Sequence, residues 1–382
     1  MKILVEGWRN INHSYSIVNQ SQILNFLKDK NVKIFFKDIN FFNSNWSEIK
    51  NSSGFKREDM EIINSLPAPN ENDFFDVTYR ISFPYNFDEK FNSKILVVFG
   101  TSEYQDIKGF YENGCLSQIK QNKNFYIHTP SQWSEKGFLN EGFLQNQVKV
   151  ISHGIDYSVF KPLSNSEFLK YRKQFNFSED DIILLSLGAM TPNKGIDILV
   201  NAFYILKKKY KSLKLVLKDQ SNLYGIKPLK LINDIINSDR NFSEEKKLQS
   251  KDIIVVSDNL NLDQLKLLYG VSNCYISPYR AEGFNLPPLE AVSSGTPIII
   301  TKGGSTDDYF KDTMGYQIES DLRHDKTKVF LEPRLESLVE QIENIITKKK
   351  EFNHNVNHDF IKKNYNWKKI SDDLLSFFKS KI

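Results

Sequence analysis

The stretch that decides the fold is Arg280-Ala281-Glu282-Gly283-Phe284-Asn285-Leu286-Pro287-Pro288-Leu289-Glu290-Ala291. Ahead of it, residues 274–278 form a short apolar run that predicts a buried strand. Behind it, residues 289–294 predict a helix, and two consecutive prolines fit only a first turn, where no backbone donor is lost. The stretch therefore predicts a strand, a loop and a helix, which is the repeating unit of an α/β protein.

The loop and the helix start combine anion-binding groups with carboxylates. The N–H groups of Phe284, Asn285 and Leu286 are expected at the helix N-terminus, where a phosphate is favoured. Glu282 precedes them in the loop, and Glu290 lies one to two turns into the helix. Carboxylates on both sides of an anion site indicate a phosphate ligand that also carries hydroxyl groups, such as a nucleotide sugar.

Two glutamates with seven residues between them, inside E-G-F-x-L-P-x-L-E-A, resemble the signature of the retaining GT-B glycosyltransferases of family 4. Without that context, the same residues form an ordinary strand–loop–helix unit in which Glu290 is solvated. The resemblance implies that Glu282 holds the hydroxyls of the donor sugar or lies near its anomeric carbon. It implies that Glu290 accepts hydrogen bonds from the ribose hydroxyls, with Gly283, Phe284, Asn285 and Leu286 also in the donor site.

Length and composition bound the class of protein. The chain has 382 residues, which suits two domains, and 40% hydrophobic with 26% charged residues indicates a globular protein. A net charge of +4 fits anionic substrates or loose contact with an acidic membrane surface, and it argues against a dedicated nucleic-acid binder.

The two cysteines, Cys115 and Cys274, provide no disulfide framework and no zinc cluster. We therefore expect neither a metal site nor a cofactor. No apolar run approaches the length of a membrane span, and the N-terminus enters a strand without a signal peptide. A cytoplasmic location follows, with peripheral contact at the inner membrane face as an option. The oligomeric state is not indicated.

The first half alternates apolar strands with helical patterns, which favours a parallel sheet flanked by helices. Strands are predicted at 2–5, 32–36, 77–79, 95–99, 125–128 and 148–152. The loop after the first strand opens onto the ligand crevice of such a sheet, so His13 and Ser14 are candidates to contact the donor phosphates or the acceptor. The alternative is that Asn12 or Ser14 caps the helix predicted over 14–28 and His13 lies on the surface.

Other polar residues follow the later strands of this half. Arg80 and Glu103 are predicted to face the same sheet edge, more as surface charges than as site residues. His128 is interpreted as a hydrogen-bonded buried imidazole rather than a cleft residue. Many members of the resembled family have a histidine where the fourth strand ends, and this chain has none there. Glu103, His13 or His128 could take its place at the acceptor.

The segment 150–162 resembles the family's x-N-G-V-D-x-x-x-F-x-P, with His153 in place of the usual Asn. It predicts a boundary between an acceptor domain at 1–160 and a donor domain at 161–359. Residues 360–382 are expected to pack back on the first domain. The resemblance implies two facing Rossmann-like doubly wound domains with the site in the cleft between them.

The second half repeats the alternation, and its first loop starts at Gly188 and contains Lys194. This loop resembles the family's G-R-x-x-x-x-K-G, whose Arg and Lys neutralise the diphosphate, but position 189 is Ala. Lys194 matches the family lysine. Lys218 ends the strand predicted at 213–217 and is our candidate for the missing cation, the alternative being a solvated strand-end lysine.

These residues favour an enzyme that moves a hexose from a UDP- or GDP-linked sugar to a saccharide or glycolipid acceptor, with retained configuration, in cell-surface polysaccharide assembly. Lys194 and Glu282 are the predicted catalytic residues. A non-catalytic protein that binds a sugar nucleotide or a partner on the same fold is the alternative, supported by Ala189. A glycoside phosphorylase is a further class, but no pyridoxal-phosphate lysine motif is apparent.

Overall fold

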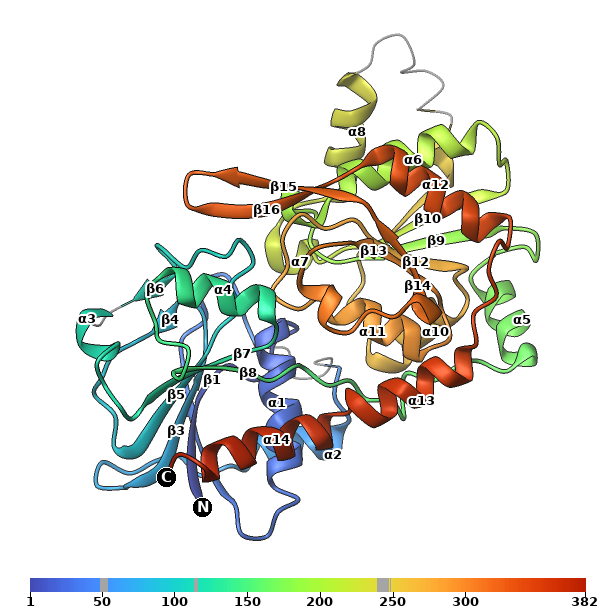
Figure 1. Cartoon of the computed structure of the whole chain (residues 1–382). Helices are drawn as coiled ribbons and strands as arrows, with labels where there is room; N and C mark the ends of the chain where they lie inside the picture. The colour runs from blue at the N-terminus through green and yellow to red at the C-terminus, as the bar shows by residue number, and fades with distance from the viewer. Residues whose placement is uncertain (49–53, 113–115, 239–246, 248) are drawn as a thin grey trace. The chain divides into compact units, whose positions relative to one another are not determined.

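The computed structural model describes residues 1–48, 54–112, 116–238, 247 and 249–382, and it divides the chain into two compact units (Figure 1). Unit 1 contains Met1–Gly154 and Asn364–Ile382, and unit 2 contains Ile155–Lys363. The chain thus leaves unit 1 before the boundary expected at 160 and returns to it after the one expected at 360. Cys115 lies outside the described residues.

Unit 1 is built on a six-stranded parallel sheet in the order β2-β1-β3-β5-β7-β8. All six strands coincide with predicted ones, because each is an apolar run bounded by polar residues. Their bounds are β1 Lys2–Gly7, β2 Lys33–Asp38, β3 Phe75–Ile81, β5 Ser93–Phe99, β7 Phe125–Thr129 and β8 Val148–Val150. A short parallel pair that the sequence pattern did not predict joins β4 (Tyr85–Asn86) to β6 (Tyr111–Glu112).

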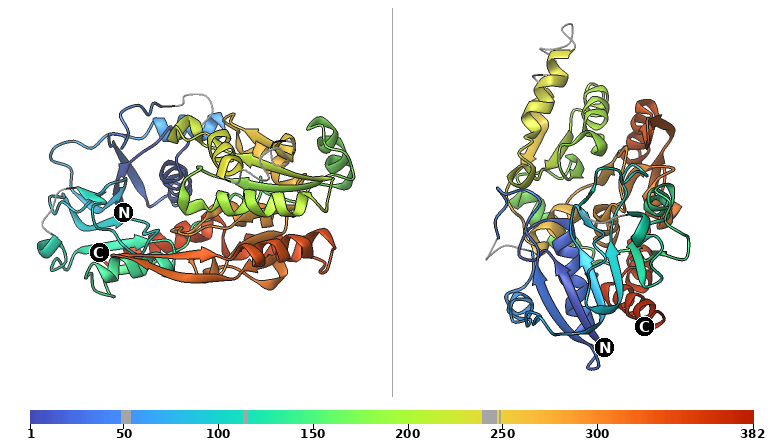
Figure 2. Two further views of the ribbon diagram at one scale, coloured as in Figure 1. Left: turned by 90° about the horizontal axis from the view of Figure 1, so that it is seen from above. Right: turned by 90° about the vertical axis from the view of Figure 1, so that its left-hand side faces the viewer.

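Helices of unit 1 cover this sheet, and one of them comes from the far end of the chain. They are α1 Ser14–Phe26, α2 Arg57–Asn64, α3 Leu116–Ile119, α4 Gln132–Asn140 and α14 Trp367–Lys379. Helix α14 lies beside α1, as two further views also show (Figure 2). Its Phe378 ring packs 6.3 Å from that of Phe26 and 5.6 Å from that of Tyr79. Apolar contact therefore holds the C-terminal helix on unit 1.

Arg80 is buried, so its interpretation as a surface charge is wrong. The strands β1 and β3 are neighbours, and their register sets Arg80 directly beside Glu6. The Arg80 Nε donates to Glu6 Oε2 at 2.6 Å, and Nη2 donates to the Lys90 carbonyl oxygen at 3.0 Å. A buried guanidinium must satisfy its donors within the protein, and this one ties the segment after β3 to the sheet.

Unit 2 repeats the architecture with a parallel sheet in the order β11-β10-β9-β12-β13-β14. The bounds are β9 Ile182–Leu187, β10 Leu213–Lys218, β11 Ile253–Val256, β12 Cys274–Ser277, β13 Ile298–Thr301 and β14 Gly315–Ile318. An apolar core that includes Leu184, Phe203, Leu215 and Ile276 lies between this sheet and its helices. Both units are therefore doubly wound α/β layers, as the alternating pattern predicted.

The helices in the described part of unit 2 are α5 Asn165–Gln174, α6 Ile196–Lys207, α7 Ser221–Tyr224, α8 Pro228–Ser238, α10 Leu262–Gly270, α11 Leu286–Ser293, α12 Leu335–Ile346 and α13 His354–Asn364. Between β14 and α12 the chain forms an antiparallel hairpin of β15 Ser320–Asp325 and β16 Lys328–Pro333, which was not predicted. Among the described residues, every helix is too short or too polar to cross a membrane.

Candidate functional site

Two loops at the carboxyl edge of the sheet of unit 2 lie against each other. One follows β9 and contains Lys194, and the other follows β12 and contains Glu282. Gly195 has a φ of +67°, and a Cβ there would lie 1.9 Å from the carbonyl oxygen of Pro278. The Arg280 N–H donates to the Asn193 carbonyl oxygen at 2.7 Å. Only glycine permits this approach at position 195, and the approach brings the two predicted catalytic residues together.

Lys194 and Glu282 form an ion pair, in which Lys194 Nζ donates to Glu282 Oε1. The side chain of Glu282 is 7% exposed, whereas that of Lys194 is 25% exposed. A charge-assisted hydrogen bond of this kind is among the stronger polar contacts in proteins. The carboxylate is thus held inside the loop, while a quarter of the lysine side chain stays exposed.

Helix α11 begins at Leu286, directly after the Glu282 loop. Asn285 precedes it with a φ of +68°, and its Nδ2 donates to Ser277 Oγ at 2.9 Å. The Asn285 carbonyl oxygen accepts from Tyr309 Oη at 2.8 Å. Because residues 287 and 288 are prolines, the donors left at the helix start are the N–H groups of Asn285 and Leu286. This end of the helix is therefore a rigid pair of donors suited to an anion.

Glu290 lies on α11, where the sequence predicts it. It is half-buried, and its Oε2 accepts a hydrogen bond from Tyr269 Oη at 2.9 Å, so it is not a solvated surface glutamate. Burial raises the pKa of Glu290 from 4.5 to about 7, and the Tyr269 hydrogen bond opposes that rise. Phe284 differs, because its ring is buried and packs 5.5 Å from that of Tyr309. The ring of Phe284 is therefore not available to a ligand.

Replacing Glu290 with Gln should change how stability depends on pH. The raised pKa means that the folded state binds this proton more tightly, so the contribution of Glu290 to the free energy of unfolding is greatest below pH 4.5 and declines up to about pH 7. We expect the stability of Glu290→Gln relative to the wild type to rise over that interval, measured by urea unfolding. Glu319→Gln, at a side chain 55% exposed, is the control. Equal pH profiles for all three proteins would contradict the prediction.

Gly188 and Lys218 lie at neighbouring strand ends. The Gly188 N–H donates to the Lys218 carbonyl oxygen at 3.0 Å, and a Cβ at Gly188 would lie 3.6 Å from Cε of Lys194. Lys218 is 8% exposed, and its Nζ donates to the carbonyl oxygen of Asp219. Burial lowers the pKa of Lys218. The alternative of a solvated strand-end lysine is therefore wrong, and Lys218 lies at the same sheet edge as Lys194.

Arg280 is a residue of the candidate site that sequence reasoning missed. Its Nη1 and Nη2 donate to the two carboxylate oxygens of Asp197 at 2.8 Å each, and Nε and Nη2 donate to Glu332 at 3.0–3.1 Å. Nη1 also donates to the carbonyl oxygen of Pro192 at 2.9 Å. One side chain thus joins both loops of the candidate site to the hairpin strand β16. Its position two residues before Glu282 could have indicated that it lies near the site. Its two carboxylate partners could not be identified, because both are distant in sequence.

His13 and Ser14 lie in unit 1, so they are described apart from the residues of unit 2. The cap of helix α1 is His13 itself, because its Nδ1 accepts the Tyr15 N–H at 3.1 Å. The expectation that Asn12 or Ser14 is the cap is wrong, since an extended histidine offers the same kind of acceptor. The His13 ring packs 5.1 Å from Trp8, and burial lowers its pKa to about 4. Ser14 is exposed.

The other acceptor candidates of unit 1 have different surroundings. His128 is fully buried, with Nδ1 2.9 Å from Tyr79 Oη and Nε2 2.9 Å from the Ile151 carbonyl oxygen. Its interpretation as a hydrogen-bonded buried imidazole is confirmed, which leaves it no face for an acceptor. Glu103 is half-buried in the loop after β5, and its carbonyl oxygen accepts from Trp133 Nε1 at 2.7 Å.

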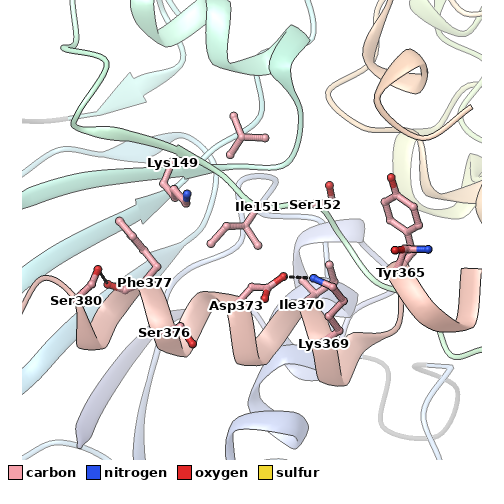
Figure 3. Close-up of a pocket in the computed structure, with 12 residues that line it drawn as sticks. Lys149, Ile151, Ser152, Tyr365, Lys369, Ile370, Asp373, Ser376, Phe377 and Ser380 are labelled. Atoms are coloured by element: carbon pink, nitrogen blue, oxygen red, sulfur yellow. Dashed lines mark hydrogen bonds and ion pairs between the residues drawn. The ribbon is translucent and has the colours of Figure 1, made fainter.

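A cavity of about 570 Å³ lies in unit 1 between residues 149–152 and helix α14 (Figure 3). Polar groups on its wall include Lys149, Ser152 and Tyr365, together with the ion pair of Lys369 Nζ and Asp373 Oδ2 at 2.5 Å. None of the residues predicted for the donor or the acceptor lines it. In the described ranges, no group of three or more His, Cys, Asp and Glu side chains is arranged to hold a metal ion.

Comparison with known proteins shows the family of the chain. The profile of the family described as glycosyl transferases group 1 matches residues 167–367, which contain Lys194, Lys218, Glu282 and Glu290. The lipopolysaccharide 1,2-N-acetylglucosaminetransferase of Salmonella typhimurium is 25% identical over 211 residues, which are 52% of this chain and 50% of that protein. The mannosylfructose-phosphate synthase of Agrobacterium fabrum is 24% identical over 163 residues, which are 43% of this chain and 34% of that protein. The chain thus spans about a third to a half of the length of these relatives.

Solved structures match the whole chain in fold. Anabaena Alr3699/HepE in complex with UDP and glucose has a TM-score of 0.66 at 13% identity, with all of both chains covered. The sucrose-phosphate synthase of Thermosynechococcus elongatus has a TM-score of 0.69 at 14% identity, covering 100% of this chain and 99% of that one. Two parallel six-stranded sheets flanked by helices, as in these proteins, make the fold GT-B.

Proposed function

Because the chain belongs to the glycosyl transferases group 1, we propose that it moves a hexose from a UDP- or GDP-linked sugar to a saccharide or glycolipid acceptor. The observation that carries the proposal is the ion pair of Lys194 and Glu282 beside the start of α11. The pair sets a cation, a buried carboxylate and two backbone donors at one edge of the sheet in unit 2. A sugar diphosphate presents the complementary groups, which are phosphate oxygens and hydroxyls.

Each residue of this edge has a proposed role. Lys194 and the N–H groups of Asn285 and Leu286 hold the diphosphate, and Glu282 accepts hydrogen bonds from the donor sugar. Glu290, fixed by Tyr269, accepts hydrogen bonds from the ribose hydroxyls. Lys218 adds a second positive charge where position 189 is Ala, and its burial strengthens its field at the phosphates. The proposal assigns charge neutralisation to these lysines and requires no metal.

The proposed transfer breaks the bond between the anomeric carbon and the β-phosphate oxygen of the donor. That oxygen keeps the electron pair, and Lys194 with the helix donors stabilises its charge. The acceptor hydroxyl oxygen forms the new bond on the same face of the sugar, so the configuration is retained. Its proton passes to the departing phosphate oxygen or to a base. His13 and Glu103 stay candidates for the base, whereas His128 is enclosed.

The acceptor class is supported by the names of relatives. Besides the Salmonella lipopolysaccharide enzyme, an O-antigen biosynthesis glycosyltransferase of Escherichia coli is 30% identical over 158 residues, 41% of this chain and 38% of that protein. We therefore propose that this chain also acts in cell-surface polysaccharide assembly. The transfer would take place at the cytoplasmic side of the membrane.

Calorimetric titration with UDP-glucose and GDP-mannose, followed by a turnover assay with saccharide and glycolipid acceptors, tests the proposal. We expect one donor to bind, Lys194→Ala and Glu282→Ala to lose turnover, and the product anomer to match the donor by NMR. Chelation with EDTA should leave turnover unchanged. Binding without turnover would favour the non-catalytic alternative, and intact turnover in both variants would overturn the site assignment.

A further inference from the structure

The chain turns from α7 into α8 over residues 225–227, and both helices are labelled in Figure 1. Large apolar side chains in and beside this turn are exposed. Ile226 is 38% exposed and Leu229 is 61% exposed, and Tyr224 just before them is 40% exposed. Gly225, at the turn between them, has a φ of +72°, and a Cβ there would meet no atom within 4 Å. The turn is therefore exposed, and the apolar side chains on both sides of it face solvent.

The charged side chains within this segment have one sign. Lys227 and Lys230 alternate with the apolar residues and are exposed, and residues 220–233 contain no aspartate or glutamate. The next acidic side chain along α8 is Asp234. Apolar side chains with lysines between them match the boundary of an anionic bilayer, where the former enter the headgroup region and the latter meet lipid phosphates.

Helix α8 limits how this contact can form. Its Ile232, Ile235 and Ile236 are buried in the core of unit 2, so the apolar face of the helix is already occupied. The exposed apolar side chains that a partner could contact lie in the first turn of α8 and in the turn before it. A stable dimer needs about 800 Å² from each subunit, which so few side chains cannot supply. A shallow, reversible contact with a membrane surface requires no such area.

We propose that residues 224–230, the membrane tip, dock unit 2 onto anionic phospholipid surfaces through Ile226 and Leu229, with Lys227 and Lys230 contacting the headgroups. This contact is independent of the proposed transferase activity, because none of these residues belongs to the donor site. It gives the weakly basic chain a defined place at which to meet an acidic membrane.

Co-sedimentation of the full chain with vesicles tests the membrane tip. We expect the wild type to bind vesicles of phosphatidylglycerol mixed with phosphatidylcholine, to bind phosphatidylcholine alone weakly, and to be released by salt. Lys227→Glu with Lys230→Glu should weaken binding by at least about fivefold per lysine, since each lysine contributes ~1 kcal/mol at an anionic surface. Ile226→Asp with Leu229→Asp should abolish it.

Ile205→Asp is the matched control, because Ile205 is 47% exposed on α6 of the same unit. It should bind vesicles like the wild type. Thermal unfolding of each variant separates lost binding from lost folding. If Ile226→Asp with Leu229→Asp is unstable, Lys227→Glu with Lys230→Glu still tests the proposal. Wild type that stays in the supernatant, or tip variants that bind as well as the wild type, would overturn the proposal. A dimer in light scattering that becomes monomeric with Ile226→Asp would also overturn it, by making the tip an interface between copies.

Discussion

Replacing Lys194 with alanine is expected to lower turnover by about 10²- to 10³-fold, the cost of removing one preorganised group that stabilises charge in a transition state. Turnover should fall further than it would on removal of a surface lysine. The reason is that the Glu282 side chain, which is 7% exposed, is left without its cation. The measurement is the initial rate at saturating donor and acceptor, together with the dissociation constant of UDP from calorimetry.

Lys302→Ala provides a matched control for Lys194→Ala. Lys302 also pairs with a glutamate, Glu319, at 2.8 Å, but both side chains are more than half exposed. An exposed pair contributes between about 0 and 1 kcal/mol, so Lys302→Ala should leave turnover and stability nearly unchanged. Turnover within twofold of the wild type in Lys194→Ala would show that the leaving diphosphate is stabilised elsewhere.

Replacing Arg280 with methionine is expected to lower turnover by about 10²-fold without unfolding the protein. Arg280 contacts the chain on both sides of Lys194, at Pro192 before it and at Asp197 after it, and it holds β16 through Glu332. Without it, the Lys194 and Glu282 loops can separate, and a displacement of about 1 Å at reacting groups can cost that factor. The side chains of Asp197 and Glu332 are 39% and 38% exposed, so their loss of a partner should cost only about 1 kcal/mol of stability.

Two further variants distinguish positioning from general stability. Arg280→Lys should restore little turnover, because an ammonium cannot form paired hydrogen bonds with two carboxylates at once. Arg334→Met is the control, since Arg334 pairs with Asp321 at the surface and joins no site loop. If Arg280→Lys regains the wild-type rate, the guanidinium is not the feature that positions the loops, and charge alone is sufficient.

The local elements of both sheets were predictable because their signals lie within a few residues of each other. The prolines at 287 and 288 restrict the chain to a helix start whichever partners surround it. Buried parallel strands such as β9 and β13 are continuous apolar runs, which a sequence displays directly. The hairpin of β15 and β16 was missed because its half-exposed strands mix charged and apolar residues without such a run.

Side-chain environments were less predictable, and Arg80 and Lys218 show why. Both looked like strand-end charges, yet both are buried in the folded chain. The partner of Arg80 is Glu6, which is 74 residues away. Nothing near Arg80 in the chain indicates that pairing, since it arises from the register of β1 with β3.

The amino-acid order alone determined the alternating α/β layers, the glutamates on either side of a helix start, and the lysine loop that follows β9. Those features depend on hydrogen bonding and apolar periodicity between residues close in the chain. Tertiary structure decided that Lys194 reaches Glu282, 88 residues away, that Arg280 ties their loops together, and that Glu290 is half-buried against Tyr269. These contacts exist only when strands distant in sequence become neighbours, because charge and burial at a site are set by whatever the folded chain brings within a few ångströms.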